Sequence, residues 1–302
     1  MIIGPNGPLG RTLTDYLLKK NYFIFQINRY LKKNNKNNKN NKNKKIKLLN
    51  FNLEKKSQLN KFLAKNSAME IYYLASKSLP SFAKENLDFF YDNLNANVFN
   101  LVNCLEAIKL SKKNHKFLYT ASSRLFEGYK NKRVNEKTPF NYNTYYSLSK
   151  DLGLKIVEFY KKNFHLHLSS VILFTIYSKY SDQNFLLPKV INQIKNNQKI
   201  NVKNANFKID FIDGQSAVFL LHKIINKKKA DNFIISSGTK FLFSKIIKEL
   251  AIFFNKNTKM INVKISKKIF CKNNYGSNKK ILNTLRLRKN YFTLKYIIKN
   301  IL

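Results

Sequence analysis

The sequence has few cysteines, no long hydrophobic run and no charged leader before an apolar stretch. Its two cysteines, Cys104 and Cys271, lie far apart and give no disulfide framework, which favours a reducing compartment. No apolar segment reaches the roughly 18 residues that a membrane-spanning helix needs, and the first residues do not resemble a secretory signal. We therefore expect a cytoplasmic protein with no membrane partner.

Acidic residues are also scarce. The 302-residue chain carries 57 Lys and Arg residues against 16 Asp and Glu residues, a net charge of +41. Strongly basic chains can bind nucleic acid, but these lysines are spread along the whole chain, as in the Lys/Asn run 32–45. No RNA-recognition, helix-turn-helix or zinc-ligand pattern is present, and the four histidines show no metal-ligand arrangement. We expect no specific nucleic-acid partner and no metal, with only incidental binding of polyanions at low salt.

Short apolar segments alternate with helical patterns through the first two thirds of the chain. The predicted strands are 1–3, 23–27, 46–51, 70–74, 116–119 and 170–174, and the predicted helices are 11–20, 57–65, 87–108 and 148–159. This alternation predicts a parallel sheet covered by helices on both faces. Beyond residue 174 the pattern is less regular, with helices near 185–195, 216–225, 243–254 and 293–301.

These patterns predict an α/β fold of two parts. A Rossmann-like doubly wound parallel sheet is expected over 1–174, with 203–226 returning to it. A smaller, partly interleaved α/β region is expected from 175–202 and 227–302.

Three glycines follow the first predicted strand. Gly4, Gly7 and Gly10 would let the backbone approach a pyrophosphate at the amino end of the next helix. A plain tight turn is the alternative explanation. Because only three residues precede Gly4, either the chain starts upstream or the central strand is very short. After the second strand, Arg29 follows Asn28, and a guanidinium there suits the 2′-phosphate of NADP, although it could be one more surface cation.

A second motif places Tyr146 four residues before Lys150, with Ser123 upstream. Residues at this spacing share one helical face. A phenol titrates near pH 10, and an ammonium about 4 Å away would stabilise the phenolate by roughly 4 kcal/mol. Tyr146 could then act as a base near neutral pH, with Ser123 bonded to the substrate hydroxyl and Lys150 also holding a ribose. Tyrosine and lysine are common in this chain, so the spacing alone decides nothing.

Two apolar stripes step by three and four residues. We expect both to face the core of the protein. The first comprises Leu87, Tyr91, Leu94, Val98, Leu101, Leu105 and Ile108, and the second comprises Leu148, Leu152, Ile156 and Phe159.

Together these segments resemble the extended short-chain dehydrogenase/reductases, and among them the GDP-mannose 4,6-dehydratases. Residues 70–78 (EIYYLASKS) are similar to that family's EIYNLAAQS, and 97–107 (NVFNLVNCLEA) to its NVxGTxNLLEA helix. Residues 121–123 match the end of the strand that carries the catalytic hydroxyl. Further similarity covers 172–174, 184–189, 204–211 and 231–238.

The resemblance implies an NADP-dependent enzyme that acts on a nucleotide sugar such as GDP-mannose, with a homodimer or dimer of dimers built from the two long helices. The implied catalytic residues are Ser123, Tyr146 and Lys150. The implied cofactor residues are Gly4, Gly7, Gly10, Arg29, Asn52, Leu53, Leu74, Ala75, Ser76, Tyr146 and Lys150. The implied substrate residues are Thr175, Asn184, Phe185, Lys189 and Lys267.

Several positions depart from the family pattern. Leu125 stands where the dehydratases place the Glu that removes the sugar C5 proton, and Glu127 would replace it only in an extended segment. Ile209 stands in place of an Arg that holds phosphate, and Lys267 replaces a second Arg. An epimerase or reductase of the same family, which needs no such Glu, and a degenerate nucleotide-binding protein therefore remain alternatives.

Overall fold

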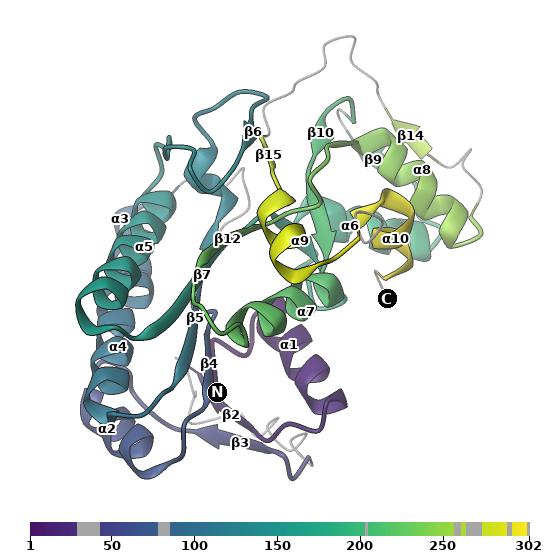
Figure 1. Cartoon of the computed structure of the whole chain (residues 1–302). Helices are drawn as coiled ribbons and strands as arrows, with labels where there is room; N and C mark the ends of the chain where they lie inside the picture. The colour runs from purple at the N-terminus through teal and green to yellow at the C-terminus, as the bar shows by residue number, and fades with distance from the viewer. Residues whose placement is uncertain are drawn as a thin grey trace. The chain divides into compact units, whose positions relative to one another are not determined.

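The computed structural model describes residues 1–28, 43–77, 85–202, 205–256, 261–263, 274–288 and 292–300 (Figure 1). The chain divides into two compact units. The first unit comprises Met1–Ala121, Thr144–Val171 and Val218–Asn232, and the second comprises Ser122–Asn143, Ile172–Ala217 and Phe233–Leu302. The two parts predicted from the sequence were divided by what each part is expected to bind, and that division stays a prediction.

A seven-stranded sheet organises the fold. Its strands are β1 (Ile2–Ile3), β2 (Ile24–Ile27), β3 (Ile46–Leu49), β4 (Glu70–Tyr73), β5 (Lys116–Ser122), β7 (His167–Leu173) and β12 (Asn232–Ile235). They lie in the order β12-β7-β5-β4-β1-β2-β3, and β3, β2, β1, β4 and β5 pair in parallel with their neighbours. The strand order reverses at β1, as in Rossmann-like sheets. The predicted fold class is therefore confirmed.

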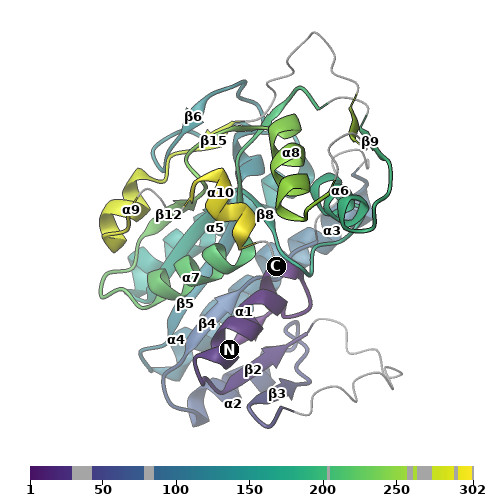
Figure 2. The same ribbon diagram turned by 90° about the vertical axis from the view of Figure 1, so that its right-hand side faces the viewer.

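Helices cover both sides of the strands in the first unit. They are α1 (Pro8–Lys19), α2 (Lys56–Lys65), α3 (Leu87–Leu94), α4 (Asn100–Ser111), α5 (Tyr145–Phe164) and the second half of α7 (Gly214–Ile225). Figures 1 and 2 show α2, α4 and α5 on one side and α1 on the other. Helix α1 begins earlier than predicted because Pro8, whose missing N–H costs nothing there, occupies its first position. Strand β1 is the predicted stub, with both residues buried between β2 and β4.

The predicted helix 87–108 contains a π-helical turn at Asn95–Phe99, between α3 and α4. A π turn holds more residues than an α turn, so it changes which side chains face the sheet. Leu101 is fully buried, whereas Leu87 and Tyr91 are 57% and 58% exposed. The expectation of one unbroken buried stripe was therefore wrong for the residues before the π turn.

Helix α5 also buries a different face from the predicted one. Phe159 is 56% exposed, and the other three residues of the predicted stripe are only half-buried. The buried residues of α5 are Tyr146, Ser147, Ser149, Lys150, Asp151, Gly153, Val157 and Tyr160. A Cβ at Gly153 would overlap the hydroxyl of Tyr119 on β5, so glycine allows the helix to lie close to this strand. Polar and small residues fill the buried face, and a hydrophobicity pattern cannot reveal it.

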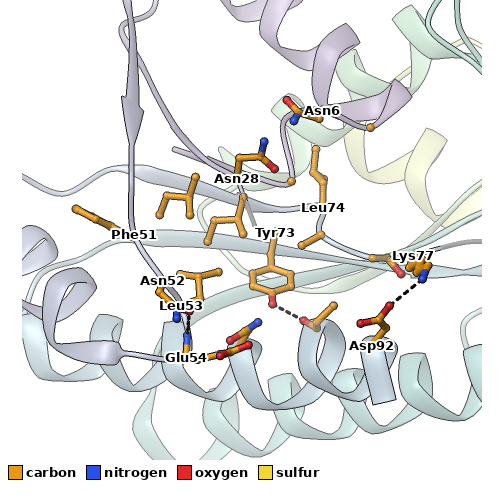
Figure 3. A pocket seen from close by; sticks show the side chains of 18 of the residues that line it. Asn6, Asn28, Phe51, Asn52, Leu53, Glu54, Tyr73, Leu74, Lys77 and Asp92 are labelled. Atoms are coloured by element: carbon orange, nitrogen blue, oxygen red, sulfur yellow. Dashed lines mark hydrogen bonds and ion pairs between the residues drawn. The ribbon is translucent and has the colours of Figure 1, made fainter. Parts of the chain in front are cut away.

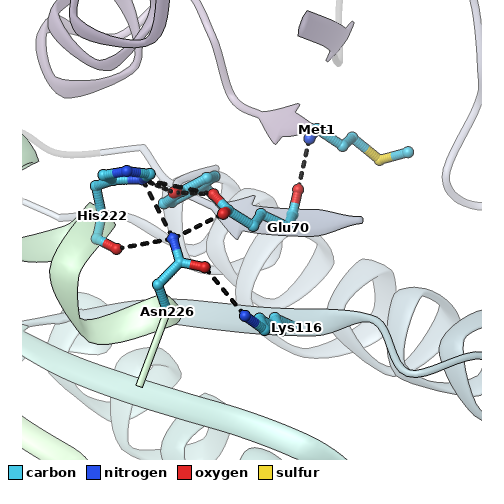
Figure 4. A network of polar contacts seen from close by, with 6 residues as sticks. Met1, Glu70, Lys116, His222 and Asn226 are labelled. Carbon is cyan, nitrogen blue, oxygen red and sulfur yellow. Dashed lines mark hydrogen bonds and ion pairs between the residues drawn. The ribbon is translucent and has the colours of Figure 1, made fainter. Parts of the chain in front are cut away.

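A polar network joins the amino ends of β4 and β5 to α7 (Figure 4). The Glu70 carboxylate accepts hydrogen bonds from Tyr72 Oη (2.6 Å) and Asn226 Nδ2 (2.7 Å), and His222 Nδ1 lies 3.6 Å from it. Lys116 donates to Asn226 Oδ1 (3.0 Å). Burial alone would raise the pKa of Glu70, but hydrogen bonds from its three neighbours outweigh burial and lower this pKa to about 2.

The second unit has shorter strands around its own apolar core. Its helices are the 3₁₀ helix Ser123–Phe126, α6 (Leu186–Lys195), α8 (Phe243–Phe253), α9 (Lys279–Leu285), α10 (Leu294–Lys299) and the start of α7. Its strands are β6 (Arg133–Val134), β8 (Thr175–Tyr177), β9 (Ile200–Val202), β10 (Lys208–Ile209), β11 (Phe211–Asp213), β13 (Phe241–Leu242), β14 (Ile261–Val263) and β15 (Tyr275–Gly276). Buried side chains of α6, α8 and α10 form the core of this unit.

A buried carboxylate holds three segments of the second unit together. Asp210 accepts hydrogen bonds from the backbone N–H (2.8 Å) and hydroxyl (2.6 Å) of Ser237 and from the N–H of Gly276 (3.0 Å). Burial raises the pKa of Asp210 to about 6, although these hydrogen bonds act in the opposite direction. Strand β15 is thereby fixed to the segments beside β11 and β12.

Candidate active site

The turn after β1 requires two of its three glycines. Gly4 has a φ of +87°, and a Cβ there would lie 2.7 Å from the backbone nitrogen of Ala75. A Cβ at Gly10 would overlap the backbone of Gly4 and Pro5. An added Cβ at Gly7 would meet no heavy atom within 4 Å, and this residue instead precedes the first turn of α1. The turn is therefore closely packed against the end of β4 at Gly4, whereas the space around Gly7, at the amino end of α1, is open.

A cavity of about 660 Å³ lies beside this turn (Figure 3). Seven of the eleven residues expected to bind the cofactor line it, namely Gly4, Gly7, Asn52, Leu53, Leu74, Ala75 and Ser76. Gly10 lies behind the turn, and Arg29 falls outside the described residues. Among the described residues that line the cavity, neither Tyr146 nor Lys150 is found.

The cavity wall contains residues that no motif indicated. Lys77 forms an ion pair with Asp92 (2.8 Å), and the hydroxyl of Tyr73 donates to the carbonyl of Ala96. Asn52, one of the residues that the resemblance implies for cofactor binding, accepts the N–H of Glu54 at its Oδ1 atom (3.0 Å). Asn6, Asn28 and Asn100 also line the cavity. They come from loops and from α4, where single polar residues carry no recognisable sequence signal.

The chemistry of this cavity suits a dinucleotide. The amino end of α1 opens onto it through Gly7, and the first turn of this helix carries no acidic side chain. Free N–H groups at such a helix end bind phosphate. Close approach of a pyrophosphate needs a backbone without Cβ atoms, and the glycine turn provides one.

Helix α5 presents Tyr146 and Lys150 on its buried face, as their spacing predicted. The Lys150 ammonium donates to the carbonyl of Thr120 on β5 (2.9 Å). Its Nζ atom lies 5.1 Å from the ring centroid of Tyr119 and 6.0 Å from that of Tyr146. Burial lowers the pKa of Lys150 to about 7, so this side chain can hold or release a proton near neutral pH.

A chain of polar side chains, of which Asn93, Asn97 and Ser149 are buried, connects the cavity to α5. Ser76 Oγ, in the cavity wall, lies 3.5 Å from Asn93 Oδ1, which accepts from Asn97 Nδ2 (3.2 Å). Asn97 Nδ2 also donates to Ser149 Oγ (3.0 Å), and Ser149 donates to the carbonyl of Tyr146 (2.8 Å). Asn97 belongs to the π turn, so this irregular turn lets one amide contact both α3 and α5. The sequence pattern missed this residue because a π turn leaves no periodic signature.

In the second unit, Ser123 begins the 3₁₀ helix that follows β5 and is half-buried. Leu125 is fully buried. Glu127 forms an ion pair with Arg124, with 3.1 Å between its carboxylate and Nε. Because this segment is helical, the extended geometry that would have let Glu127 replace the expected Glu does not occur.

Most of the residues expected to bind substrate lie on the surface of the second unit. Thr175 is exposed at the start of β8. Asn184 and Phe185 precede α6, and Lys189 projects from its first turn with its N–H bonded to the carbonyl of Phe185 (3.0 Å). Lys267 lies outside the described residues.

The sheet order, the glycine turn and the Tyr-x-x-x-Lys helix define a short-chain dehydrogenase/reductase fold. The chain belongs to the GDP-mannose 4,6-dehydratase family, whose sequence model matches residues 1–289. A GDP-mannose 4,6-dehydratase of Drosophila melanogaster is 23% identical over 253 residues, which are 79% of this chain and 63% of that protein. One from Vibrio cholerae is 22% identical over 270 residues, covering 83% and 72% of the two chains.

Solved structures of an epimerase and a dehydratase that act on nucleotide sugars share this fold. A UDP-N-acetylglucosamine 4-epimerase from Methanobrevibacter ruminantium has a TM-score of 0.80 at 16% identity, covering 99% of this chain and 96% of that one. A dTDP-glucose 4,6-dehydratase from Bacillus anthracis, solved with NAD, has a TM-score of 0.77 at 17% identity, covering 99% and 94%. At such identities the similarity shows the fold alone. Within the described part of the chain, no helix is long and apolar enough to cross a membrane.

Proposed function

We propose that this protein is an NADP-dependent nucleotide-sugar dehydratase that converts GDP-mannose to GDP-4-keto-6-deoxymannose. Family membership supports the reaction class. The observation that carries the proposal is the buried Tyr146–Lys150 pair, which shares one compact unit with the glycine-lined cavity. A binding pocket in the same compact unit as a buried lysine with a lowered pKa is typical of an active site.

The cavity would hold NADP, with its pyrophosphate at the turn that Gly4, Gly7 and Gly10 form and its 2′-phosphate at Arg29. Asn52, Leu53, Leu74, Ala75 and Ser76 would surround the rest of the dinucleotide. When bound, NADP takes a hydride from the sugar C4 and returns one to C6. Arginine is the reason to propose NADP in place of the NAD found in several structural neighbours.

Three side chains would take part in the oxidation of the sugar. Tyr146 would accept the proton of the C4 hydroxyl, with Ser123 hydrogen-bonded to the same oxygen. Lys150 would favour the ionised phenol while positively charged. Its pKa of about 7 leaves it partly neutral in the protein alone, and an anionic dinucleotide nearby would raise this pKa and restore the charge.

The nucleotide sugar would contact the second unit. We propose contacts with Thr175, Asn184, Phe185, Lys189 and Lys267. Phe185 offers an aromatic side chain, and two lysines offer charges for the diphosphate. A lysine supplies a single point charge, so binding would be weaker than with the two arginines of the family pattern.

A homodimer, with a dimer of dimers as the larger possibility, would cover the exposed apolar sides of α3 and α5. Leu87, Tyr91 and Phe159 are each more than half exposed. These helices pack together in the first unit, where the rings of Phe90 and Tyr145 stack with centroids 4.7 Å apart. A large exposed apolar surface of this kind indicates association.

The proposal is tested by incubating purified protein with GDP-mannose and NADP and identifying the nucleotide sugars by mass spectrometry. We expect a product lighter by one water, and none from Tyr146→Phe. Bound NADP without any sugar product in the parent protein would contradict the proposal and favour a degenerate nucleotide-binding protein. Separate titrations with NADP and NAD, repeated for Arg29→Ala, test the cofactor: the substitution should weaken NADP binding about 10-fold or more and leave NAD binding almost unchanged.

A 4-epimerase of the same family is the second candidate. Leu125, which is apolar and fully buried, favours it because epimerisation requires no base for C5. Interconversion of sugar isomers at constant mass would support this reading, and a 4-keto-6-deoxy product would exclude it.

A further inference from the structure

Loss of water across C5 and C6 requires a base for the C5 proton, which is acidic because C4 is then a ketone. A carboxylate is a suitable general base for this step. In the second unit the two nearest candidates by sequence do not qualify. Leu125 has no titratable group, and the carboxylate of Glu127 pairs with Arg124 in a helical segment. The base must therefore come from a residue that no motif indicated.

Glu85 contacts the residue that carries the proposed catalytic phenol. One of its carboxylate oxygens accepts the backbone N–H of Tyr146 (3.2 Å). The two residues are 61 positions apart in sequence but belong to the same unit. The side chain of Glu85 is half-buried. It therefore places a carboxylate at the amino end of α5, beside the first turn from which Tyr146 projects.

The residues that follow Glu85 are held by contacts of their own. The next residue, Asn86, caps α3 by accepting the N–H of Phe89 (2.9 Å). Phe90 of α3 stacks on Tyr145, the first residue of α5, at an interplanar angle of 23°. These contacts tie the start of α3, where Glu85 lies, to the start of α5. Such support for a functional side chain reduces its freedom and holds its geometry.

We propose that Glu85 is the catalytic base of the elimination step, a role that rests on the proposed dehydratase function. Its carboxylate takes the C5 proton, the C5–H electron pair forms the C5–C6 double bond, and the C6–O bond breaks. The protonated Glu85 then gives its proton to the departing oxygen, which leaves as water. The step is balanced without an added reactant, and the unsaturated ketone then accepts hydride at C6 and a solvent proton at C5.

The test compares Glu85→Gln with Glu127→Gln in the full chain, with NADP and GDP-mannose. A glutamine at position 85 can still accept the Tyr146 N–H, but it cannot remove a proton. We expect Glu85→Gln to form the 4-keto-6-deoxy product about 10²–10⁴-fold more slowly while still reducing NADP in a single turnover. Glu127→Gln should behave as the parent protein does. Thermal unfolding and NADP affinity should be unchanged in both variants.

Rescue of a variant by an added carboxylate distinguishes a catalytic base at position 85 from a residue that only makes a structural contact. In Glu85→Ala, added formate should restore part of the elimination rate, because a small carboxylate can enter the vacated space. Product formation by Glu85→Gln at the parent's rate would overturn the role. So would loss of NADP reduction together with elimination in Glu85→Gln, since Glu85 would then only position α5. A parent protein that gives no 4-keto-6-deoxy product would instead overturn the proposed function, and the role of Glu85 with it.

Discussion

Replacing Lys150 by methionine should stabilise the protein at acidic pH even though it removes a proposed catalytic group. Burial lowers the pKa of Lys150 from 10.5 to about 7, and at about 1.36 kcal/mol per pH unit this difference corresponds to roughly 5 kcal/mol. Methionine has a similar shape and removes this cost. The carbonyl of Thr120, which Lys150 contacts at 2.9 Å, loses its partner, at a cost of about 1–3 kcal/mol. We expect a net gain of about 2–4 kcal/mol at pH 6.

The gain should depend on pH in a defined direction. Between about pH 7 and pH 10.5 the folded protein binds fewer protons at Lys150 than the unfolded chain does, so the stability of the parent rises with pH in this range. The cost of burying the ammonium is complete below about pH 7 and is relieved as pH rises towards 10.5. The advantage of Lys150→Met should therefore shrink on going to alkaline pH and then reverse.

Urea unfolding without cofactor, at several pH values between 6 and 10, measures both effects. Lys162→Met is a suitable control, because Lys162 lies on the same helix and its side chain is exposed. Its free energy of unfolding should change by less than about 1 kcal/mol. An advantage of Lys150→Met that is the same at every pH, or a loss of stability at pH 6, would refute the reasoning.

Three further predictions test other parts of the structure. Gly4→Ala should lower the free energy of unfolding in urea by about 2–5 kcal/mol, because a Cβ meets Ala75 and φ is positive; Gly7→Ala, with open space around it, should cost less than about 1 kcal/mol. The pKa of Glu70 is lowered in the folded protein, so the stabilisation that its carboxylate provides is complete above about pH 4.5 and is lost as pH falls towards 2. Glu70→Gln should abolish up to about 3 kcal/mol of this dependence of stability on pH. Tyrosine fluorescence during an acid titration would measure the change. Tyr91→Glu and Phe159→Glu should shift the proposed dimer to monomer in analytical ultracentrifugation, and an unchanged sedimentation coefficient would argue against association through α3 and α5.

The sequence predicted the parts of the fold that depend on local patterns. Short apolar segments separated by helical periodicity gave the strands and the helices of the first unit within a few residues. The glycine spacing indicated the turn between β1 and α1, where Gly4 has the positive φ that such a turn requires. The spacing of Tyr146 and Lys150 correctly placed them on one face of α5. Each of these features is encoded within a few neighbouring residues.

Features that depend on distant residues could not be predicted. The buried face of α5 consists of serines, a lysine and a glycine, because Thr120 and Tyr119 of β5 supply their partners. An apolar stripe was therefore assigned to the wrong side of this helix. The π turn of Asn97 is also invisible to a helical period, since an apolar pattern does not record one inserted residue. Glu85 contacts Tyr146 across a long sequence separation that no local pattern contains.

The hydrogen bonds of Asp210 have a consequence for the synthesis of the protein. Its carboxylate receives donors from Ser237 and from Gly276, and the second of these lies 66 residues further along the chain. While the ribosome is still translating this stretch, Asp210 has no partner from β15, and α10 cannot yet close the core of the second unit. Domains emerging from the ribosome fold as soon as their contacts are available. The second unit should therefore fold only after β15 and α10 have been synthesised, and until then its apolar helices stay exposed to aggregation.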